Sequence, residues 1–176
     1  MTGMEKIGVV LVGHGVPALD CPPRLVGELM ALQWGDGGHG HGSGNSGPAA
    51  QRSAQLDAQI RNWPRRPDND PYKEGLERLA RSLRPLLGTE LFAIGYNEFC
   101  SPSVPEAIEG VIRQGATRVL VIPSMLTPGG LHSEIDIPKA IERTRERFPQ
   151  VDIRYIWPFD LKEVASLLAS HLQRHA

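Results

Sequence analysis

The chain alternates between short runs of branched apolar residues and longer segments in which leucine or isoleucine recurs every three or four residues. Runs typical of strands buried on both faces occupy residues 6–13, 90–96, 117–123 and 151–156. Helical spacing occupies residues 22–33, 72–86, 103–114, 137–147 and 161–171, and residues 53–62 allow one more short helix. This alternation predicts an α/β fold in which right-handed crossovers place helices on both faces of a parallel sheet.

Local signals support several of these helix boundaries. Pro23 and Pro138 lie in first turns, where proline is tolerated. Ser103 is a candidate N-cap, and Glu106, three residues later, completes a capping box. Gly88 ends the helix that precedes the second strand.

Two segments interrupt the pattern without indicating a second domain. Residues 34–52 are rich in glycine and include His39 and His41, so we expect a flexible insertion that either binds metal loosely or is inert. Residues 63–71 read as a turn-rich connector with several prolines and arginines. The length suits one domain over residues 1–176.

Composition narrows the possible functions. The formal net charge of -1 gives no basic field for nucleic acid, and no apolar run reaches the length of a membrane span. The start of the chain leads directly into the first strand, which argues against a signal peptide. We expect Cys21 and Cys100 to be reduced, small hydrophobic residues of a cytoplasmic protein. Neither a dinucleotide-binding glycine motif nor a P-loop is present, so no nucleotide is expected.

Three residues that can bind metal follow three different predicted strands. His14 stands between two glycines directly after the first strand, Glu98 follows the second, and His132 follows the third through a glycine-containing loop. The carboxyl ends of parallel strands meet at one edge of a sheet, so we expect the three side chains to converge there. Two imidazoles and a carboxylate suit a divalent ion such as cobalt, nickel, iron or zinc.

Each residue also has a simpler interpretation when taken alone. The two histidines could be hydrogen-bonded loop residues, and Glu98 could be a solvated carboxylate. Glu134 and Asp136 could fix the tautomer of His132 or could cap the helix that follows it.

Longer motifs around these residues resemble a known family. The sequence reads Val-Gly-His-Gly at residues 12–15, Asn-Glu-Phe-Cys-Ser-Pro-Ser-Val-Pro-Glu-Ala-Ile at 97–108, and Gly-Gly-Leu-His-Ser-Glu-Ile-Asp-Ile-Pro at 129–138. These motifs resemble the short-type sirohydrochlorin cobaltochelatases, which are CbiX/SirB-like, ATP-independent class II tetrapyrrole chelatases. One departure is Val16, since the family usually has serine after Gly-His-Gly.

The resemblance implies a chelatase-like, flavodoxin-like three-layer sandwich around a four-stranded parallel sheet. It implies that His14 and His132 bind metal and that Glu98 is a further ligand or proton acceptor. The implied reaction inserts Co²⁺, or alternatively Fe²⁺, Ni²⁺ or Zn²⁺, into sirohydrochlorin or a related tetrapyrrole. It also implies a homodimer that completes the cleft. The carboxylate-rich substrate calls for cations at the mouth of the site, and the candidates near rim loops are Arg24, Arg65, Arg66 and Lys73. Each of them could equally be an ordinary solvated surface residue.

Two other functions fit the same residues. A non-catalytic protein that binds or delivers divalent metal could use the same fold, with the histidine-containing insertion as a collector. A metal-dependent hydrolase-like site would instead hold an ordered water at the metal.

Overall fold

The structure, a computed structural model, describes residues 5–34 and 47–176. Its strands are β1 (Ile7–Gly13), β2 (Phe92–Tyr96), β3 (Arg118–Pro123) and β4 (Asp152–Tyr155). Its α-helices are α1 (Pro23–Trp34), α2 (Pro48–Arg61), α3 (Pro71–Leu83), α4 (Val104–Arg113), α5 (Ile137–Arg147) and α6 (Leu161–Gln173). A 3-10 turn (Arg84–Leu86) follows α3, and a π-helical turn (His132–Asp136) precedes α5.

The four strands form one parallel sheet in the order β2-β1-β3-β4. Gly13 pairs with Tyr96 of β2, and Val12 pairs with Pro123 of β3. Three strands therefore end at the same level, and the loops that follow them begin side by side at one edge of the sheet.

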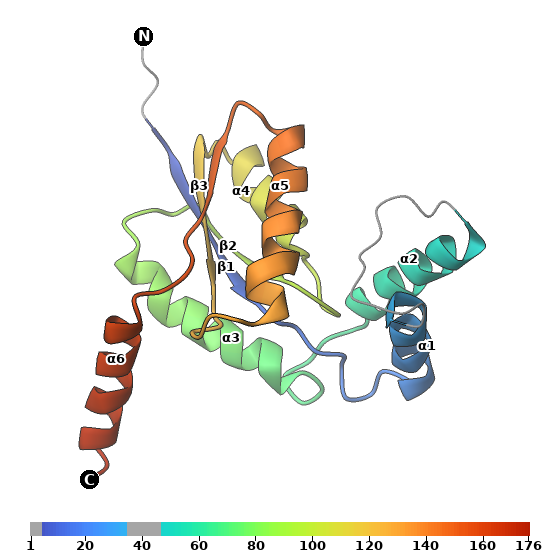
Figure 1. Cartoon of the computed structure of the whole chain (residues 1–176), viewed down its shortest axis with the longest axis horizontal. Helices are drawn as coiled ribbons and strands as arrows, with labels where there is room; N and C mark the ends of the chain where they lie inside the picture. The colour runs from blue at the N-terminus through green and yellow to red at the C-terminus, as the bar shows by residue number, and fades with distance from the viewer. Residues whose placement is uncertain (1–4, 35–46) are drawn as a thin grey trace.

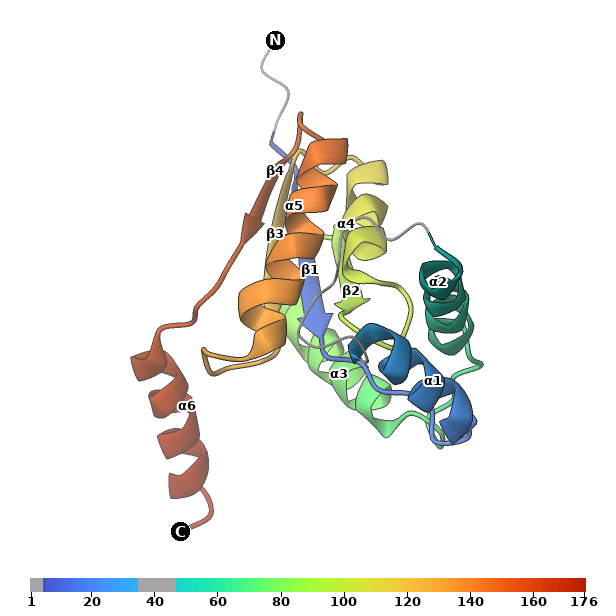
Figure 2. The same cartoon turned by 45° about the vertical axis from the view of Figure 1, so that its right-hand side comes forward.

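Helices cover both faces of this sheet, as Figure 2 shows. Val10 and Val12 of β1 point to the face covered by α4 and α5, where they join the largest core cluster. Leu11, between them, points to the opposite face and packs with Leu76 of α3. The predicted α/β three-layer sandwich with a four-stranded parallel sheet is confirmed.

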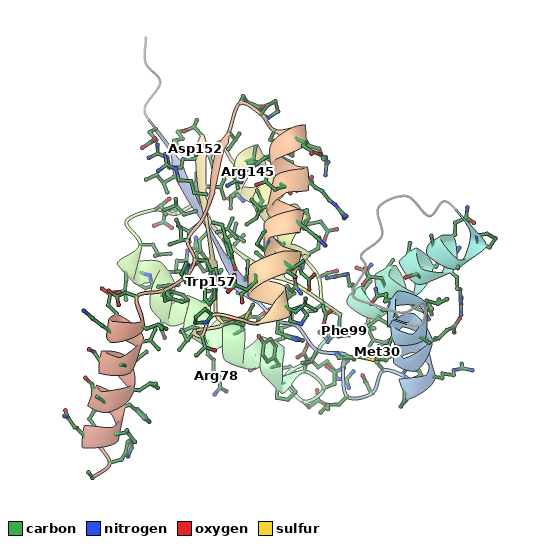
Figure 3. All side chains as sticks on the ribbon, viewed as in Figure 1. Met30, Arg78, Phe99, Arg145, Asp152 and Trp157 are labelled. Carbon is green, nitrogen blue, oxygen red and sulfur yellow. The ribbon has the colours of Figure 1, made fainter. Side chains whose placement is uncertain are left out.

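The α1–α2 pair lies beside the sheet and has a core of its own (Figure 1). Leu29 of α1 packs with Leu56 and Ile60 of α2, and all three are almost completely buried. Phe99, from the loop after β2, belongs to the same cluster. Figure 3 shows Phe99 between the sheet and the pair, near Met30.

Two local features differ from the sequence-based expectation. Helix α2 begins at Pro48 rather than at residue 53, because Pro48 suits a first helical turn and alanine and glutamine follow it. The π-helical turn before α5 has no counterpart among the predicted elements. Residues 35–46 of the predicted insertion, including His39 and His41, lie outside the described residues.

Helix α6 stands apart from the layers in both views (Figures 1 and 2). It has no buried residue, and Leu167, Leu168 and Leu172 are more than half exposed. None of the helices in the described part of the chain combines the length and apolar character of a membrane span.

Candidate metal centre

The side chains of His14, Glu98 and His132 converge at the carboxyl edge of the sheet. The Nε2 atoms of both histidines lie 3.9 Å from Glu98 Oε2, and the imidazole rings have centroids 4.5 Å apart at 85°. One ligand atom from each residue lies within 4.8 Å of the other two. The convergence predicted from the strand ends is therefore confirmed. All three residues are partly buried, so the centre remains open to solvent on one side.

Glycines allow the loop after β1 to pass close to the loop after β2. Gly15 has a φ of +85°, and a Cβ atom built there would lie 1.9 Å from the carbonyl oxygen of Glu98. The Glu98 N–H donates to the His14 carbonyl at 2.8 Å, which ties the two loops together. A side chain at Gly15 would therefore push two metal-competent residues apart.

The backbone and ring of His14 are both fixed. Its backbone N–H donates to the Tyr72 hydroxyl of α3 at 2.7 Å. Its Nδ1 lies 2.6 Å from the Gly15 carbonyl, which only accepts hydrogen bonds. The proton of a neutral ring therefore belongs on Nδ1, and the Nε2 lone pair faces Glu98 and His132.

Asp136 fixes His132 in the same way. The π-helical turn brings Asp136 Oδ2 to 2.8 Å from His132 Nδ1, so the carboxylate accepts the Nδ1 proton and leaves Nε2 free. Glu134 instead accepts from the Gly129 N–H and from the indole N–H of Trp157. Of the two acidic residues considered from sequence, Asp136 is the one that orients the histidine.

Two residues outside the π-helical turn contact it. The Asn97 Nδ2 atom lies 2.8 Å from His132 Nδ1, but it makes no hydrogen bond there when Asp136 accepts the Nδ1 proton, because both nitrogens then carry hydrogen. The Tyr155 hydroxyl donates to the carbonyl of the buried residue Ser133. The turn therefore lies against the loop after β2 and is anchored to β4.

Two arginines at the end of α2 and just beyond it hold the loop that carries Glu98. Arg61 donates to the carbonyls of Asn97 at 2.8 Å and Cys100 at 2.9 Å. Arg65 donates to the carbonyl of Phe99, a residue whose φ of 53° lies in the left-handed region that non-glycine residues rarely adopt. This positioning role leaves no pattern in the sequence, because the acceptors are backbone carbonyls and every residue has one.

The donor set suits a borderline divalent metal ion. Nitrogen and oxygen ligands bound to one such ion at the usual bond lengths lie roughly 3–4 Å apart. The two 3.9 Å separations are at the upper end of that range, so a small inward movement would close the set around an ion. Three protein ligands would leave coordination positions open toward solvent.

The four cations predicted to bind substrate carboxylates do not line the cleft beside Glu98. Arg65 is largely buried in an ion pair with Asp70, Arg66 contacts two exposed aspartates, and Lys73 pairs with Glu77. Arg24 is exposed on α1. Their contact with substrate stays a prediction.

The two cysteines are not suited to bind the metal ion. Cys21 and Cys100 are both free and buried, and burial raises the pKa of each thiol. A neutral thiol is a poor ligand, so both behave as the small hydrophobic residues predicted from sequence.

Comparison with known proteins points to one family. The CbiX family model matches residues 68–174, which include Glu98 and His132. The chain is 39% identical over 66 residues to a sirohydrochlorin ferrochelatase of Priestia megaterium, covering 38% of this chain and 24% of that protein. It is 42% identical over 77 residues to a sirohydrochlorin cobaltochelatase of the same organism, covering 43% and 25%.

Among solved structures, SirB from Bacillus subtilis with Fe³⁺ matches with a TM-score of 0.49 and 20% identity, over 85% of this chain and 39% of that one. The matches with the two Priestia enzymes span about a quarter of their length. Because the family model matches more than half of the chain, the protein belongs to the CbiX family.

Proposed function

We propose that the protein inserts a divalent metal ion into sirohydrochlorin or a related tetrapyrrole without ATP. The observation that carries the proposal is the convergence of His14, Glu98 and His132 at the carboxyl edge of the sheet, where one ligand atom from each lies within 4.8 Å of the others and both Nε2 atoms lie 3.9 Å from Glu98 Oε2. Membership of the CbiX family supports it, as do relatives named as chelatases. Cobalt is the metal we favour, with iron, nickel or zinc as alternatives, since the ligand types suit all four.

The same three side chains can hold the metal ion and then accept protons. Metal insertion breaks metal–protein bonds, forms bonds from the metal to four ring nitrogens and releases two pyrrole protons. Each histidine has its Nδ1 committed to a carbonyl or carboxylate, so only Nε2 is available for either task. As the ion moves into the ring, the freed Nε2 and carboxylate atoms become bases beside the pyrrole N–H groups.

A second copy of the chain is part of the proposal. His14 has a side chain that is 39% exposed, so one side of the centre is uncovered in a single chain. A macrocycle bound there would present one face to this chain and the other to solvent. A homodimer in the cytoplasm would place another surface over that face.

The test follows the absorption spectrum of sirohydrochlorin during incubation with Co²⁺ and protein. We expect His14→Ala and His132→Ala to lose at least 100-fold in insertion rate, because each removes a metal ligand, and to keep their circular dichroism spectra. His171→Ala is the matched control, since His171 is exposed on α6 far along the chain from the centre. Binding of Co²⁺ with no insertion above the spontaneous rate would instead indicate a non-catalytic metal-binding or delivery protein.

A further inference from the structure

A cleft with a volume of about 390 Å³ opens beside the metal centre, between α5 and the α1–α2 pair. Figure 1 shows α5 facing the pair across this region. Glu98 and Asp136 lie at its metal-centre end, and Lys139 and Arg143 line it along α5. The cleft is therefore continuous with the site that would hold the ion.

Lys139 and Arg143 lie four residues apart and so share one face of α5. Neither side chain makes an ion pair or hydrogen bond within the described ranges 5–34 and 47–176, and both residues are exposed. Other cations of α5 are paired: Arg145 pairs with Glu142 of the same helix, and Arg147 pairs with Glu109 of α4.

The acidic residues of the cleft have other partners. Asp57 pairs with Arg61, Glu106 accepts from the Ser103 N–H and hydroxyl, and Asp136 accepts from His132. Glu106 belongs to the start of α4, and its hydrogen bonds from Ser103 lower the pKa of its carboxyl group. Among the described residues, no ion pair joins an acidic residue of the cleft to the two positive charges of the α5 wall.

The opposite wall has a different character. Leu29, Ala58 and Asn62 line it without charge. Arg61 also lines it, but its guanidinium is bound to Asp57 and to backbone carbonyls. An anionic ligand in the cleft would therefore turn its negative edge toward α5.

We infer that Lys139 and Arg143 bind carboxylate groups on the rim of the macrocycle and thereby hold its centre over the metal ligands. The inference rests on the proposed function. The helical rise places Lys139 and Arg143 about 4.5 and 10.5 Å along the axis from Asp136, the residue that orients His132. Carboxylate groups of a tetrapyrrole project from the ring periphery, several ångströms from its central nitrogens. Two cations spaced along α5 match that arrangement.

The test measures sirohydrochlorin binding to the metal-free protein by fluorescence quenching, and insertion kinetics with Co²⁺. For Lys139→Ala and Arg143→Ala we expect the Kd and KM for sirohydrochlorin to rise about tenfold each, as for loss of a charge-assisted hydrogen bond. The double variant Lys139→Glu/Arg143→Glu should show a larger rise. Co²⁺ affinity and the rate at saturating sirohydrochlorin should not change.

Two controls make the result specific. Lys162→Ala removes an exposed cation from α6 and should bind sirohydrochlorin as the wild type does. A fully methyl-esterified sirohydrochlorin carries no carboxylate charge, so the wild type and the Lys139 and Arg143 variants should bind it equally.

The outcomes separate this inference from the proposed function. If the wild type binds and metallates sirohydrochlorin while the Lys139 and Arg143 variants keep wild-type Kd and KM, the inference is overturned and the proposed function stands. If the wild type neither binds nor metallates sirohydrochlorin, both are overturned. If the Kd of the Lys139 and Arg143 variants rises as much for the esterified macrocycle as for sirohydrochlorin, the substitutions have removed packing contacts and not charge recognition. That result would also overturn the inference.

Discussion

The sheet and the α1–α2 pair contribute to the metal centre in different ways. The ends of β1, β2 and β3 supply the loops that carry the three candidate ligands, and strand pairing sets their level. The α1–α2 pair and the connector after it supply no ligand, but they bind the ligand-bearing loops through Arg61, Arg65 and the ring of Phe99. The sheet therefore determines which residues meet, and the peripheral pair restrains the loop on which one of them sits.

The CbiX family model matches β2, β3 and β4 but neither the α1–α2 pair nor β1 with His14. The match begins at residue 68, after α2 and after Arg61 and Arg65. The α1–α2 pair nevertheless has its own buried core and contributes a wall of the cleft. The helices before residue 68 therefore contact the loop that carries Glu98 and line the cleft beside it.

The largest effect should come from the point where the two strand-end loops touch. Gly15→Ala places a methyl group 1.9 Å from the Glu98 carbonyl oxygen at a φ of +85°, so the loops must separate. We expect Co²⁺ binding to fall below detection by isothermal titration calorimetry. Gly27→Ala is the matched control, because a Cβ there meets nothing within 4 Å and alanine favours the α1 helix. Wild-type Co²⁺ affinity in Gly15→Ala would show that the contact does not align the ligands.

The second largest effect should come from Arg65, which connects the segment after the α1–α2 pair to the loop that carries Glu98. Arg65 and Asp70 form an ion pair with side-chain exposures of 9% and 1%, so Arg65→Ala leaves a buried carboxylate without its cation. We expect a loss of about 3–5 kcal/mol in the free energy of unfolding, measured with urea. Arg66→Ala removes the neighbouring arginine, which is 53% exposed, and should lose about 1 kcal/mol or less.

Equal losses of unfolding free energy in Arg65→Ala and Arg66→Ala would contradict the structural role of Arg65. The same two variants also test the predicted contact of these arginines with substrate. A rise in the KM for sirohydrochlorin in Arg66→Ala, with stability unchanged, would support that contact for Arg66.

Much of this architecture could be predicted because it depends on local patterns. Branched apolar runs identified the strands, and Ser103 with Glu106 identified the start of α4, where the structure has the capping box. His14, Glu98 and His132 could be grouped because parallel strands end at one edge.

Other features depend on contacts that sequence spacing does not record. Arg61 and Arg65 bind backbone carbonyls, and every residue has a carbonyl, so their partners were not predictable. The π-helical turn before α5 depends on hydrogen bonding that differs from an α-helix by one residue, a difference that apolar spacing does not reveal. The leucines of α6 have helical spacing, yet none of its residues is buried among residues 5–34 and 47–176.

The smallest effect should come from Asp136, which orients His132 and is not one of the three candidate metal ligands. Asp136→Asn replaces the carboxylate that accepts the Nδ1 proton by an amide that can also donate, so the tautomer with a free Nε2 is no longer enforced. We expect Co²⁺ affinity to fall about 10- to 100-fold with little change in stability. Glu134→Gln changes a nearby carboxylate that does not contact His132, and it should retain wild-type affinity. Similar losses in both variants would indicate a general charge effect.

The most direct measurement is anomalous diffraction from a crystal of the protein soaked with Co²⁺. We expect one strong peak about 2.0–2.2 Å from His14 Nε2, His132 Nε2 and an oxygen of Glu98. Cobalt bound elsewhere, such as at the exposed pair of His171 and His175 whose rings lie 4.8 Å apart, with no peak at the sheet edge would contradict it.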